Sequence, residues 1–137
     1  MINKTDAQVI NIGNYILNGA NNLQSIKFDV EKINIGDCSF SSANKLQTIE
    51  INSKSSIKIE KESFSNNNNL QTVSLIGNTI HLGNKCFYKS FYIYLNGRYG
   101  SNWVTIKSES KLEFDSNCFN ESNLQTINIY GEEIIVK

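Results

Sequence analysis

A six-residue pattern that occurs four times constrains this chain more than any other feature of its sequence. It consists of leucine, glutamine, a small hydroxyl residue, an aliphatic residue, any residue and a second apolar residue, and its copies are residues 23–28, 46–51, 70–75 and 124–129. The first three copies begin 23 and 24 residues apart. Self-similarity at a fixed period of this size is the sequence signature of a repeat architecture, in which each repeat is one small structural unit.

A second pattern lies between these copies and consists of two apolar residues separated by one residue, then four other residues, then a large apolar residue. Its copies are Ile10, Ile12 and Leu17; Ile33, Ile35 and Phe40; Ile57, Ile59 and Phe64; Ile80, Leu82 and Phe87; Leu112, Phe114 and Phe119. A sixth copy begins with Ile134 and Val136. Apolar residues that alternate with polar ones are typical of strands with one buried face. Each repeat is therefore predicted to form two short parallel strands, with little helix.

The repeats are predicted to stack into a mainly β repeat solenoid of about five turns of roughly 23 residues. One turn cannot bury enough apolar surface to offset the entropy of ordering its backbone, whereas stacked turns cover one another and share strand hydrogen bonds. The large apolar residues expected to form a column through the core, called here the spine, are Leu17, Phe40, Phe64, Phe87 and Phe119. We predict one domain over residues 1–137, with a partial N-terminal cap at 1–9 and an incomplete last turn at 130–137.

Glycine and asparagine mark the joins between the predicted strands. Gly13, Gly36 and Gly83 follow the second strand in three of the five repeats, a placement suited to a turn that needs positive φ. Asparagine recurs just before the leucine strand, as in residues 66–69, where it tolerates left-handed φ in a tight corner. Both residue types therefore indicate tight corners at regular positions.

The fourth repeat departs from the pattern, because Ser90 stands where a leucine is expected. We take residues 91–95 as its first strand, which makes residues 96–107 an inserted hairpin or loop of about 12 residues. A second register takes residues 101–106 as the strand and residues 88–100 as the insert. The first register is the one adopted.

The insert lies in the most aromatic part of the sequence, since 7 of the 14 phenylalanine, tryptophan and tyrosine residues fall from Phe87 to Trp103. Asn96-Gly97 is suited to the tight turn of a hairpin, and Gly100-Ser101-Asn102 is a second candidate for its tip. Tryptophan, tyrosine and arginine dominate the binding energy of interfaces, and loops often carry function. The binding residues predicted on this basis are Tyr92, Tyr94, Arg98, Tyr99 and Trp103. An alternative interpretation is that these rings repair the core of the fourth repeat.

Taken together, the two patterns resemble the BspA-like class of leucine-rich repeat over nearly the whole chain; the unit of that class, about 23 residues long, reads L-x-x-I-x-[IL] and then [IV]-x-x-I-G-x-x-A-F. The resemblance implies a right-handed leucine-rich-repeat coil whose first strand lines a sheet, and a protein-binding or adhesion surface, often at the cell surface. The chain departs from the family in having no proline. The residues that replace the alanine before the spine position are Ile16, Ser39, Ser63, Cys86 and Cys118.

Few residues have the chemistry for catalysis or metal binding. His81 is the one histidine, lies on the outward side of a strand and has no evident partner, whereas acid–base catalysis needs a second positioned group. Cys38, Cys86 and Cys118 lack the CxxC spacing of zinc or redox sites and are expected to be small buried thiols. We therefore predict no enzyme activity, no catalytic residue, no metal and no cofactor.

Charge and hydropathy argue against several classes of partner. Lys plus Arg and Asp plus Glu each number 13, so the net charge is zero and favours neither nucleic acid nor an anionic membrane. No apolar run approaches the roughly 18 residues of a membrane span, and residues 1–6 lack the apolar core of a signal peptide. We expect no nucleic acid partner and no membrane insertion. The compartment is left open between the cell surface that the resemblance implies, the cytoplasm, and a fragment of a longer chain.

The function predicted from the sequence is non-enzymatic protein recognition or adhesion through the aromatic insert. The alternative is a structural subunit that self-associates through open solenoid ends, because residues 132–137 begin a turn without finishing it and leave a strand edge that invites pairing. Another protein is the expected partner in the first case, and a second copy of the chain in the second. A glycan that stacks on tyrosine and tryptophan is a further candidate ligand.

Overall fold

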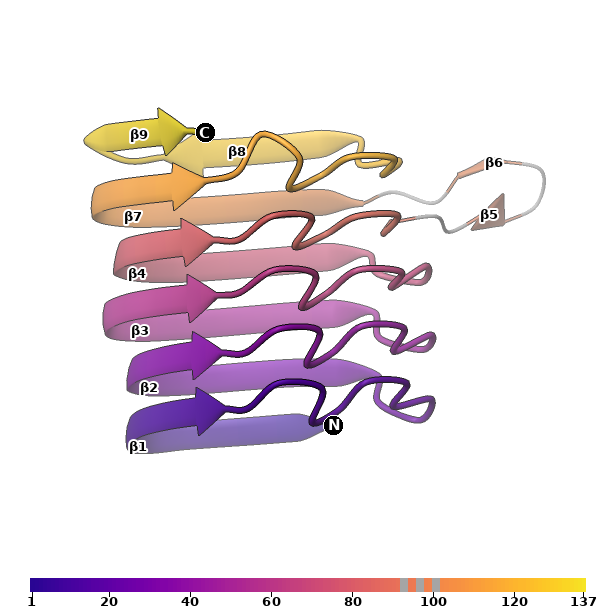
Figure 1. Ribbon diagram of the computed structural model, residues 1–137, viewed down its shortest axis with the longest axis horizontal. Helices are drawn as coiled ribbons and strands as arrows, with labels where there is room; N and C mark the ends of the chain where they lie inside the picture. Colours follow the sequence, from indigo (N-terminus) through magenta and orange to yellow (C-terminus); the bar gives the residue numbers. More distant parts are fainter. Residues whose placement is uncertain (92–93, 96–97, 100–101) are drawn as a thin grey trace.

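The computed structural model describes residues 1–91, 94–95, 98–99 and 102–137, and the side chains of residues 3–7, 94–95 and 98–99 lie outside this description. Within the described residues the chain forms a β-solenoid without helix, in which parallel strands stack turn upon turn (Figure 1). The stacked strands are β1 (Ile2–Ile12), β2 (Ser25–Ile35), β3 (Thr48–Ile59), β4 (Thr72–Leu82), β7 (Trp103–Phe114), β8 (Thr126–Tyr130) and β9 (Glu133–Val136). The predicted repeat solenoid of about five turns is confirmed.

The stacked strands form one seven-stranded parallel sheet in the order β1-β2-β3-β4-β7-β8, with β9 also paired to β7. The predicted partial N-terminal cap covers residues 1–9, and all of these except Met1 belong to β1, which pairs with β2. The register keeps equivalent residues of successive repeats side by side, as in Ile26↔Ile49 and Ile49↔Val73. Each position of the repeat therefore forms a column that runs along the axis of the solenoid.

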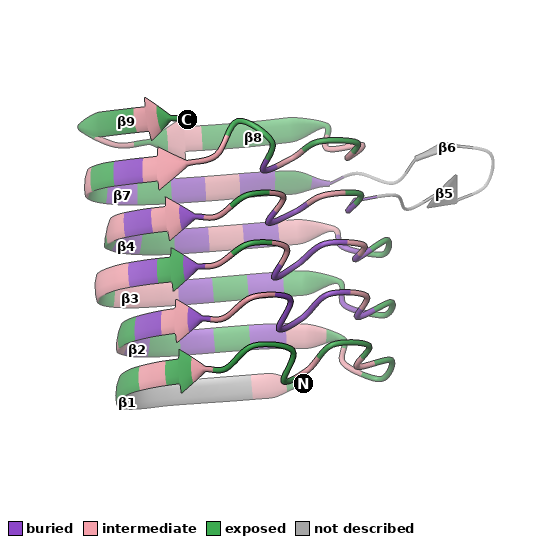
Figure 2. Cartoon of the chain, viewed as in Figure 1, coloured by how far each residue is buried: buried purple, intermediate pink, exposed green. Residues whose placement is uncertain are grey.

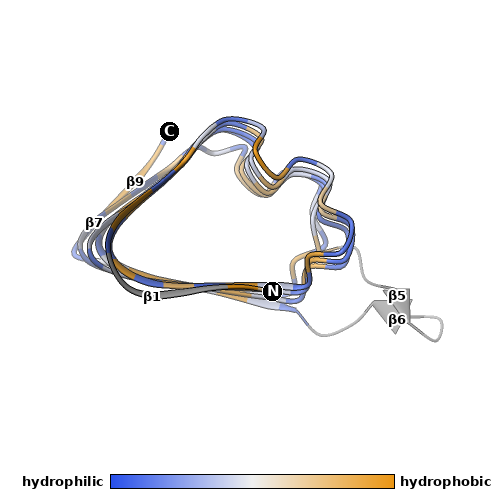
Figure 3. Cartoon of the chain, turned by 90° about the horizontal axis from the view of Figure 1, so that it is seen from below, coloured by the Kyte–Doolittle hydropathy of each residue, from blue (hydrophilic) through white to orange (hydrophobic). Residues whose placement is uncertain are grey.

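The two strands predicted in each regular repeat run into one another in the structure. β1 to β4 and β7 are each unbroken for 11 or 12 residues, and the bend between their halves is a shift in register, for example between Val30 and Lys32. Serine side chains stabilise this bend, since the hydroxyls of Ser53 and Ser55 donate to the carbonyl oxygen of Glu31 at 2.7 and 2.8 Å. The bent strand and the loop that follows it together enclose the core (Figure 3). In the last turn the two halves are the separate strands β8 and β9.

The core contains the spine that the sequence predicts. The ring centroids of Phe40 and Phe64 are 5.1 Å apart, those of Phe64 and Phe87 are 5.5 Å apart, and those of Phe87 and Phe119 are 5.3 Å apart. Leu17 packs against the same core at its N-terminal end. Burial is deepest in the middle turns and decreases in the first and last (Figure 2). Successive turns are thus joined through their interior by direct contact between rings.

The register adopted for the fourth repeat is wrong, and the second register is correct. Residues 103–106 belong to β7, which pairs with β4 so that Val104 lies beside Val73 and Ile106 lies beside Leu75. The physical reason is strand continuity. The adopted register would interrupt the strand at its bend with an insert of about 12 residues, whereas β7 runs unbroken to Phe114.

The insert lies between Phe91 and Asn102, rather than at residues 96–107. It contains a separate antiparallel hairpin of β5 (Tyr94–Leu95) and β6 (Arg98–Tyr99), with Leu95 paired to Arg98. The predicted turn at Asn96-Gly97 lies outside the described residues, as do Gly100 and Ser101 of the second candidate. The insertion therefore enters at a corner of the solenoid, where it leaves the ladder of the sheet intact.

Two backbone corners with positive φ recur along the stack, and they are mostly formed by residues other than glycine. The first corner is at Tyr15, Cys38, Glu62 and Lys85, and the second is at Gly19, Ser42, Asn66, Lys89 and Glu121. The prediction of positive φ at Gly13, Gly36 and Gly83 is wrong, because among the described glycines Gly19 alone has positive φ. A Cβ on Gly36 would lie 2.8 Å from the carbonyl carbon of Gly13, and one on Gly83 would lie 2.8 Å from that of Glu60. Close approach of the preceding turn is what requires glycine at these two positions.

Candidate functional site

The outward side chains at the start of the strands form a column of small hydroxyl residues with one large exception. In-register pairing of β2, β3, β4, β7 and β8 aligns Ser25, Thr48, Thr72, Trp103 and Thr126. Neighbours in such a column are about 4.8 Å apart. A hollow of about 530 Å³ lies over this face, and its lining includes Met1, Lys27, Glu50, Ser74 and Trp103. We call the outward side of the first half of the strands the hydroxyl face.

Of the predicted binding residues, Trp103 is the one for which the structure describes both the backbone and the side chain. It is the first residue of β7, and its side chain is 39% exposed at the C-terminal side of the hollow. Asn102 holds the backbone immediately before it: its side-chain oxygen accepts from the amide of Gln125 at 2.6 Å, and its side-chain nitrogen donates to the carbonyl of Asn123 at 3.1 Å. The amide of Trp103 itself donates to the carbonyl of Gln71 at 2.9 Å. Hydrogen bonds to both neighbouring turns therefore fix the position from which the indole projects.

The hairpin contains three of the other predicted binding residues. Tyr94 and Tyr99 are paired across it, and Arg98 is paired with Leu95. Their side chains lie outside the described residues, and Tyr92 lies outside them entirely. The hairpin projects from the stack beside the start of β7, which is also where Trp103 lies (Figure 1). The structure thus places the hairpin next to one end of the hydroxyl face.

The interpretation that aromatic residues repair the core applies to Phe91. This ring is fully buried, with its centroid 6.0 Å from that of Phe87 in the spine. The fourth repeat has no leucine two positions before its strand, whereas the second and third repeats bury Leu46 and Leu70 there. Phe91 supplies apolar volume to the repeat that lacks this leucine. Trp103 makes no such contribution, because it lies on the outer surface.

Two further large residues of the hydroxyl face were not predicted from the sequence. Ile76 and Tyr130 are 40% and 55% exposed, and both lie in the column of Lys107, whose ammonium group is 5.5 Å from the centroid of the Tyr130 ring. Each directly follows the last inward residue of a first half-strand, so its local pattern is that of an ordinary outward position. Only the register brings Ile76, Lys107 and Tyr130 together. They extend the apolar part of this face away from Trp103.

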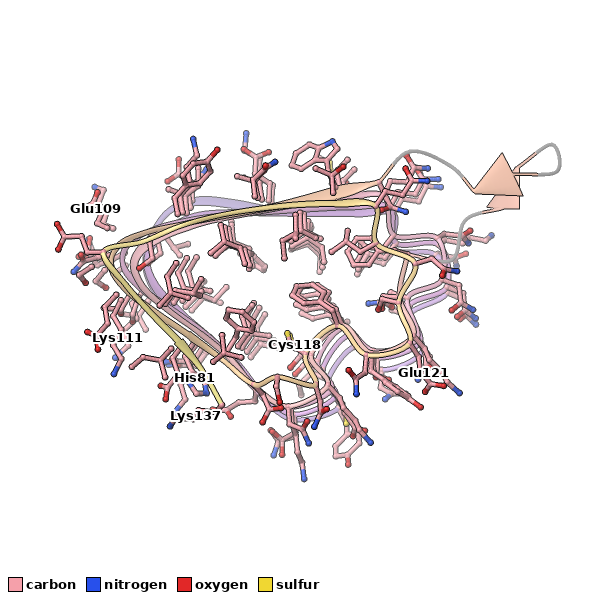
Figure 4. The ribbon with its side chains drawn as sticks, turned by 90° about the horizontal axis from the view of Figure 1, so that it is seen from above. His81, Glu109, Lys111, Cys118, Glu121 and Lys137 are labelled. Atoms are coloured by element: carbon pink, nitrogen blue, oxygen red, sulfur yellow. The ribbon has the colours of Figure 1, made fainter. Side chains whose placement is uncertain are left out.

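The outward side of the second half of the strands is charged, and it contains His81. The expectation that this histidine has no partner is wrong, because register pairs it with Glu113, and its Nδ1 lies 3.2 Å from the Glu113 carboxylate. Lys137 also forms a salt bridge with Glu113. Hydrogen bonding to Lys137 and then to His81 lowers the pKa of Glu113. Figure 4 shows His81, Lys111 and Lys137 on this outer side, where a hollow of about 370 Å³ lies.

The cysteines are buried free thiols, as predicted. Burial raises the pKa of Cys86 well above its ordinary value, so the reactive thiolate is disfavoured. Figure 4 shows Cys118 directed toward the interior. Among the described residues, His, Cys, Asp and Glu side chains form no group of three or more that could hold a metal ion.

Comparison with known proteins identifies one family. A family model described as the BspA type leucine rich repeat region (6 copies) matches residues 3–98. No curated protein matches the chain, and no solved structure matches it. In the part of the chain that the structure describes, no helix is long and apolar enough to cross a membrane.

Proposed function

The chain belongs to the BspA-type leucine-rich repeat family, and from that premise we propose that it is a non-enzymatic module for protein recognition or adhesion. Leucine-rich repeats generally mediate interactions between proteins and are generally not enzymes. The proposed binding surface consists of the hydroxyl face with Trp103 and the hairpin with Tyr94, Arg98 and Tyr99, together with Tyr92. Another protein is the proposed partner.

The observation that carries this proposal is the position of Trp103. Its neighbours in the column are Thr72 and Thr126, whose small polar side chains suit a solvated sheet. An indole in their midst leaves a large apolar surface in contact with water and is unnecessary for packing, since the core of β7 is filled by Val104 and Ile106. Tryptophan is enriched among the residues that dominate interface energetics, and its ring combines apolar area with one hydrogen-bond donor.

The size of the face supports a protein partner that also contacts the hairpin. Six strands about 4.8 Å apart, with half-strands of about five residues at roughly 3.3 Å each, give a flat area on the order of 400 Å². A stable protein interface buries about 800 Å² on each partner. The hydroxyl face alone is too small for this, and the hairpin leaves the stack beside it. Both are therefore proposed as parts of one surface.

The test uses the chain itself to capture and then characterise a partner. Wild type, a Trp103→Ser, Tyr99→Ser double variant and a Lys58→Ser control on the charged outer side are immobilised and exposed to an extract of the native source. A protein retained by wild type and control, but not by the double variant, is purified and titrated in solution. Trp103 is the sole tryptophan, so its emission reports directly on occupancy of this face.

The expected result is a shift in Trp103 emission when wild type or control is titrated. The double variant contains no tryptophan, so its affinity is measured by isothermal titration calorimetry alongside the other two forms, and it should bind at least about tenfold more weakly, which corresponds to about 1.4 kcal/mol. Equal binding by all three forms, or an emission spectrum that stays constant at saturation, would contradict the proposed surface. A glycan array probed with the same three forms tests the other ligand class. Binding of an oligosaccharide that depends on Trp103 would show that the ligand of this surface is a glycan rather than a protein.

A further inference from the structure

We propose that Cys86 and Cys118 form a disulfide bond that joins two neighbouring turns of the solenoid through its core. The bond would lie beside the spine and close a loop from residue 86 to residue 118, which contains the hairpin and all of β7. It uses no residue of the hydroxyl face or of the hairpin, so it is separate from the proposed function.

The first observation is that the two cysteines occupy equivalent positions in neighbouring turns. Each directly precedes a spine residue, Phe87 or Phe119, and the rings of these two residues stack with their centroids 5.3 Å apart. The amide of Phe87 donates to the carbonyl oxygen of Cys118 at 2.8 Å. Neighbouring turns of a parallel stack are about 4.8 Å apart, and a disulfide joins residues whose Cα atoms are about 4.4 to 6.8 Å apart. The alignment of the two turns therefore suits a disulfide.

The second observation is that the two thiols share one buried environment. Cys86 and Cys118 are 0% and 1% exposed and belong to the same hydrophobic core. Both are free thiols in the structure, and Figure 4 shows Cys118 directed inward. Burial, and then a hydrogen bond with the Cys118 thiol, raise the pKa of Cys86. The two thiols are thus hydrogen-bonding neighbours inside the core.

The third observation is the residue that the second and third repeats have at this position. It is Ser39 in one and Ser63 in the other, and each hydroxyl donates to two backbone carbonyls. The Ser63 hydroxyl donates to Gly36 of the preceding turn at 2.7 Å and to Glu60 of its own turn at 2.8 Å. A thiol is a weak donor in comparison with a hydroxyl. In the fourth and fifth repeats, side chains that can be linked covalently replace side chains that link turns by strong hydrogen bonds.

The third cysteine is excluded from this bond by its position. Cys38 lies one residue earlier in the repeat and two turns before Cys86, which places it at least about 9.6 Å away. This exceeds the limit of about 7 Å for the Cα atoms of a disulfide. Its Sγ lies 3.6 Å from the carboxylate of Glu62 instead. Among the three cysteines, the fold therefore favours a single pairing.

The oxidant in this reaction is a small-molecule disulfide such as glutathione disulfide. The thiolate of one cysteine attacks a sulfur of this disulfide, releases one glutathione thiolate and forms a mixed disulfide. The thiolate of the other cysteine then attacks the protein sulfur of the mixed disulfide and releases the second glutathione thiolate. The two glutathione thiolates take up the protons of Cys86 and Cys118, and the glutathione gains the two electrons that the protein loses. Because both thiols are buried after the turns have stacked, the exchange takes place while the chain folds.

The test refolds the chain in the presence of this oxidant. Wild type, Cys86→Ser, Cys118→Ser and the control Cys38→Ser are unfolded and reduced, and then refolded with a mixture of glutathione and glutathione disulfide. Serine occupies this position in two other repeats, so the first two variants should fold, and far-ultraviolet circular dichroism of the reduced proteins checks this. Remaining thiols are alkylated in denaturant, and mass spectrometry of the intact and digested chain counts them and maps the bond.

We expect wild type to keep one free thiol, that of Cys38, and Cys38→Ser to keep none, with Cys86 linked to Cys118 in both. Cys86→Ser and Cys118→Ser should form no bond within the chain. Oxidised wild type should have a Tm at least about 5 °C above that of the reduced protein, because the bond restricts the unfolded chain over a long loop. Cys86→Ser should show no such difference.

Three results would overturn the proposal. They are three free thiols in refolded wild type, a bond in wild type that includes Cys38, and an oxidised wild type whose Tm is equal to or below that of the reduced protein.

Discussion

Phe64 lies at the middle of the spine, fully buried between the rings of Phe40 and Phe87. Phe64→Ala removes both ring contacts and leaves a cavity that the hydrogen-bonded turns on either side cannot close. We expect the free energy of unfolding to fall by about 3 to 5 kcal/mol, measured by denaturant titration. Phe64→Leu, which retains most of the volume, should lose clearly less. A loss below about 1 kcal/mol for Phe64→Ala would show that the spine is not a main source of stability.

Gly83 is required by close packing between turns. A Cβ at this position would lie 2.7 Å from the amide nitrogen of Lys61, and the Gly83 amide is itself held by a 2.8 Å hydrogen bond to the carbonyl of Ile59. We expect Gly83→Ala to destabilise the protein by about 1 to 3 kcal/mol, because the backbone must move to admit the methyl group. Gly131→Ala is the control, since the nearest atom to its Cβ would be 3.5 Å away. Equal losses for the two variants in denaturant titration would contradict this explanation.

The Glu113 carboxylate connects β7 to β4 through His81 and to the end of the chain through Lys137. These hydrogen bonds, that to Lys137 first, lower its pKa. A lowered carboxyl pKa contributes stability that is present above the unfolded value of about 4.3 and is lost as the pH falls through the folded value. Glu113→Gln should therefore lower Tm at about pH 6, and this effect should decrease as the pH falls below the unfolded value toward about pH 3. Thermal unfolding measured at both pH values tests this, and an equal decrease at each would contradict it.

At the scale of the element, the regular strands can be predicted because two independent sequence patterns agree on each of them. The fourth repeat is different, since residues 91–95 and 103–106 both alternate in the manner of a strand. The second segment is the strand because β7 continues unbroken through its bend to Phe114. The bend exists only in the folded turn, so the sequence alone does not decide between the two segments. The register also determines the candidate site: Trp103 can be chosen from its residue type, whereas Ile76 and Tyr130 become neighbours of Lys107 only after the strands are aligned.

Asn102 fastens the start of β7 to the following turn. Its side chain is almost fully buried and bonds Gln125 and Asn123, so Asn102→Ala would leave the Gln125 amide and the Asn123 carbonyl without these partners. We expect a loss of about 1 to 3 kcal/mol in the free energy of unfolding. Because Trp103 is the next residue, its fluorescence emission should also move to longer wavelength as the strand start loosens. An Asn102→Ala variant with native stability and emission would contradict this role.

At the scale of the whole molecule, the columns of the repeat give the solenoid two outer surfaces of different chemistry. The hydroxyl face lies on the outward side of the first half of the strands, and the charged side with His81 and Glu113 lies on the outward side of the second half. Trp103 lies at the start of β7 on the hydroxyl face, so the proposed recognition uses the first surface and is separable by mutation from the second.

All of these inferences depend on the alignment of β7 with β4, which directs Val104 and Ile106 inward and Trp103 outward. Cross-strand nuclear Overhauser effects between backbone protons test this alignment most directly. We predict contacts that link Val73 with Val104 and Leu75 with Ile106. Contacts from Val73 to Ile93 in place of Val104 would show that the rejected register is correct. The core and the binding surface described for the fourth repeat would then be wrong.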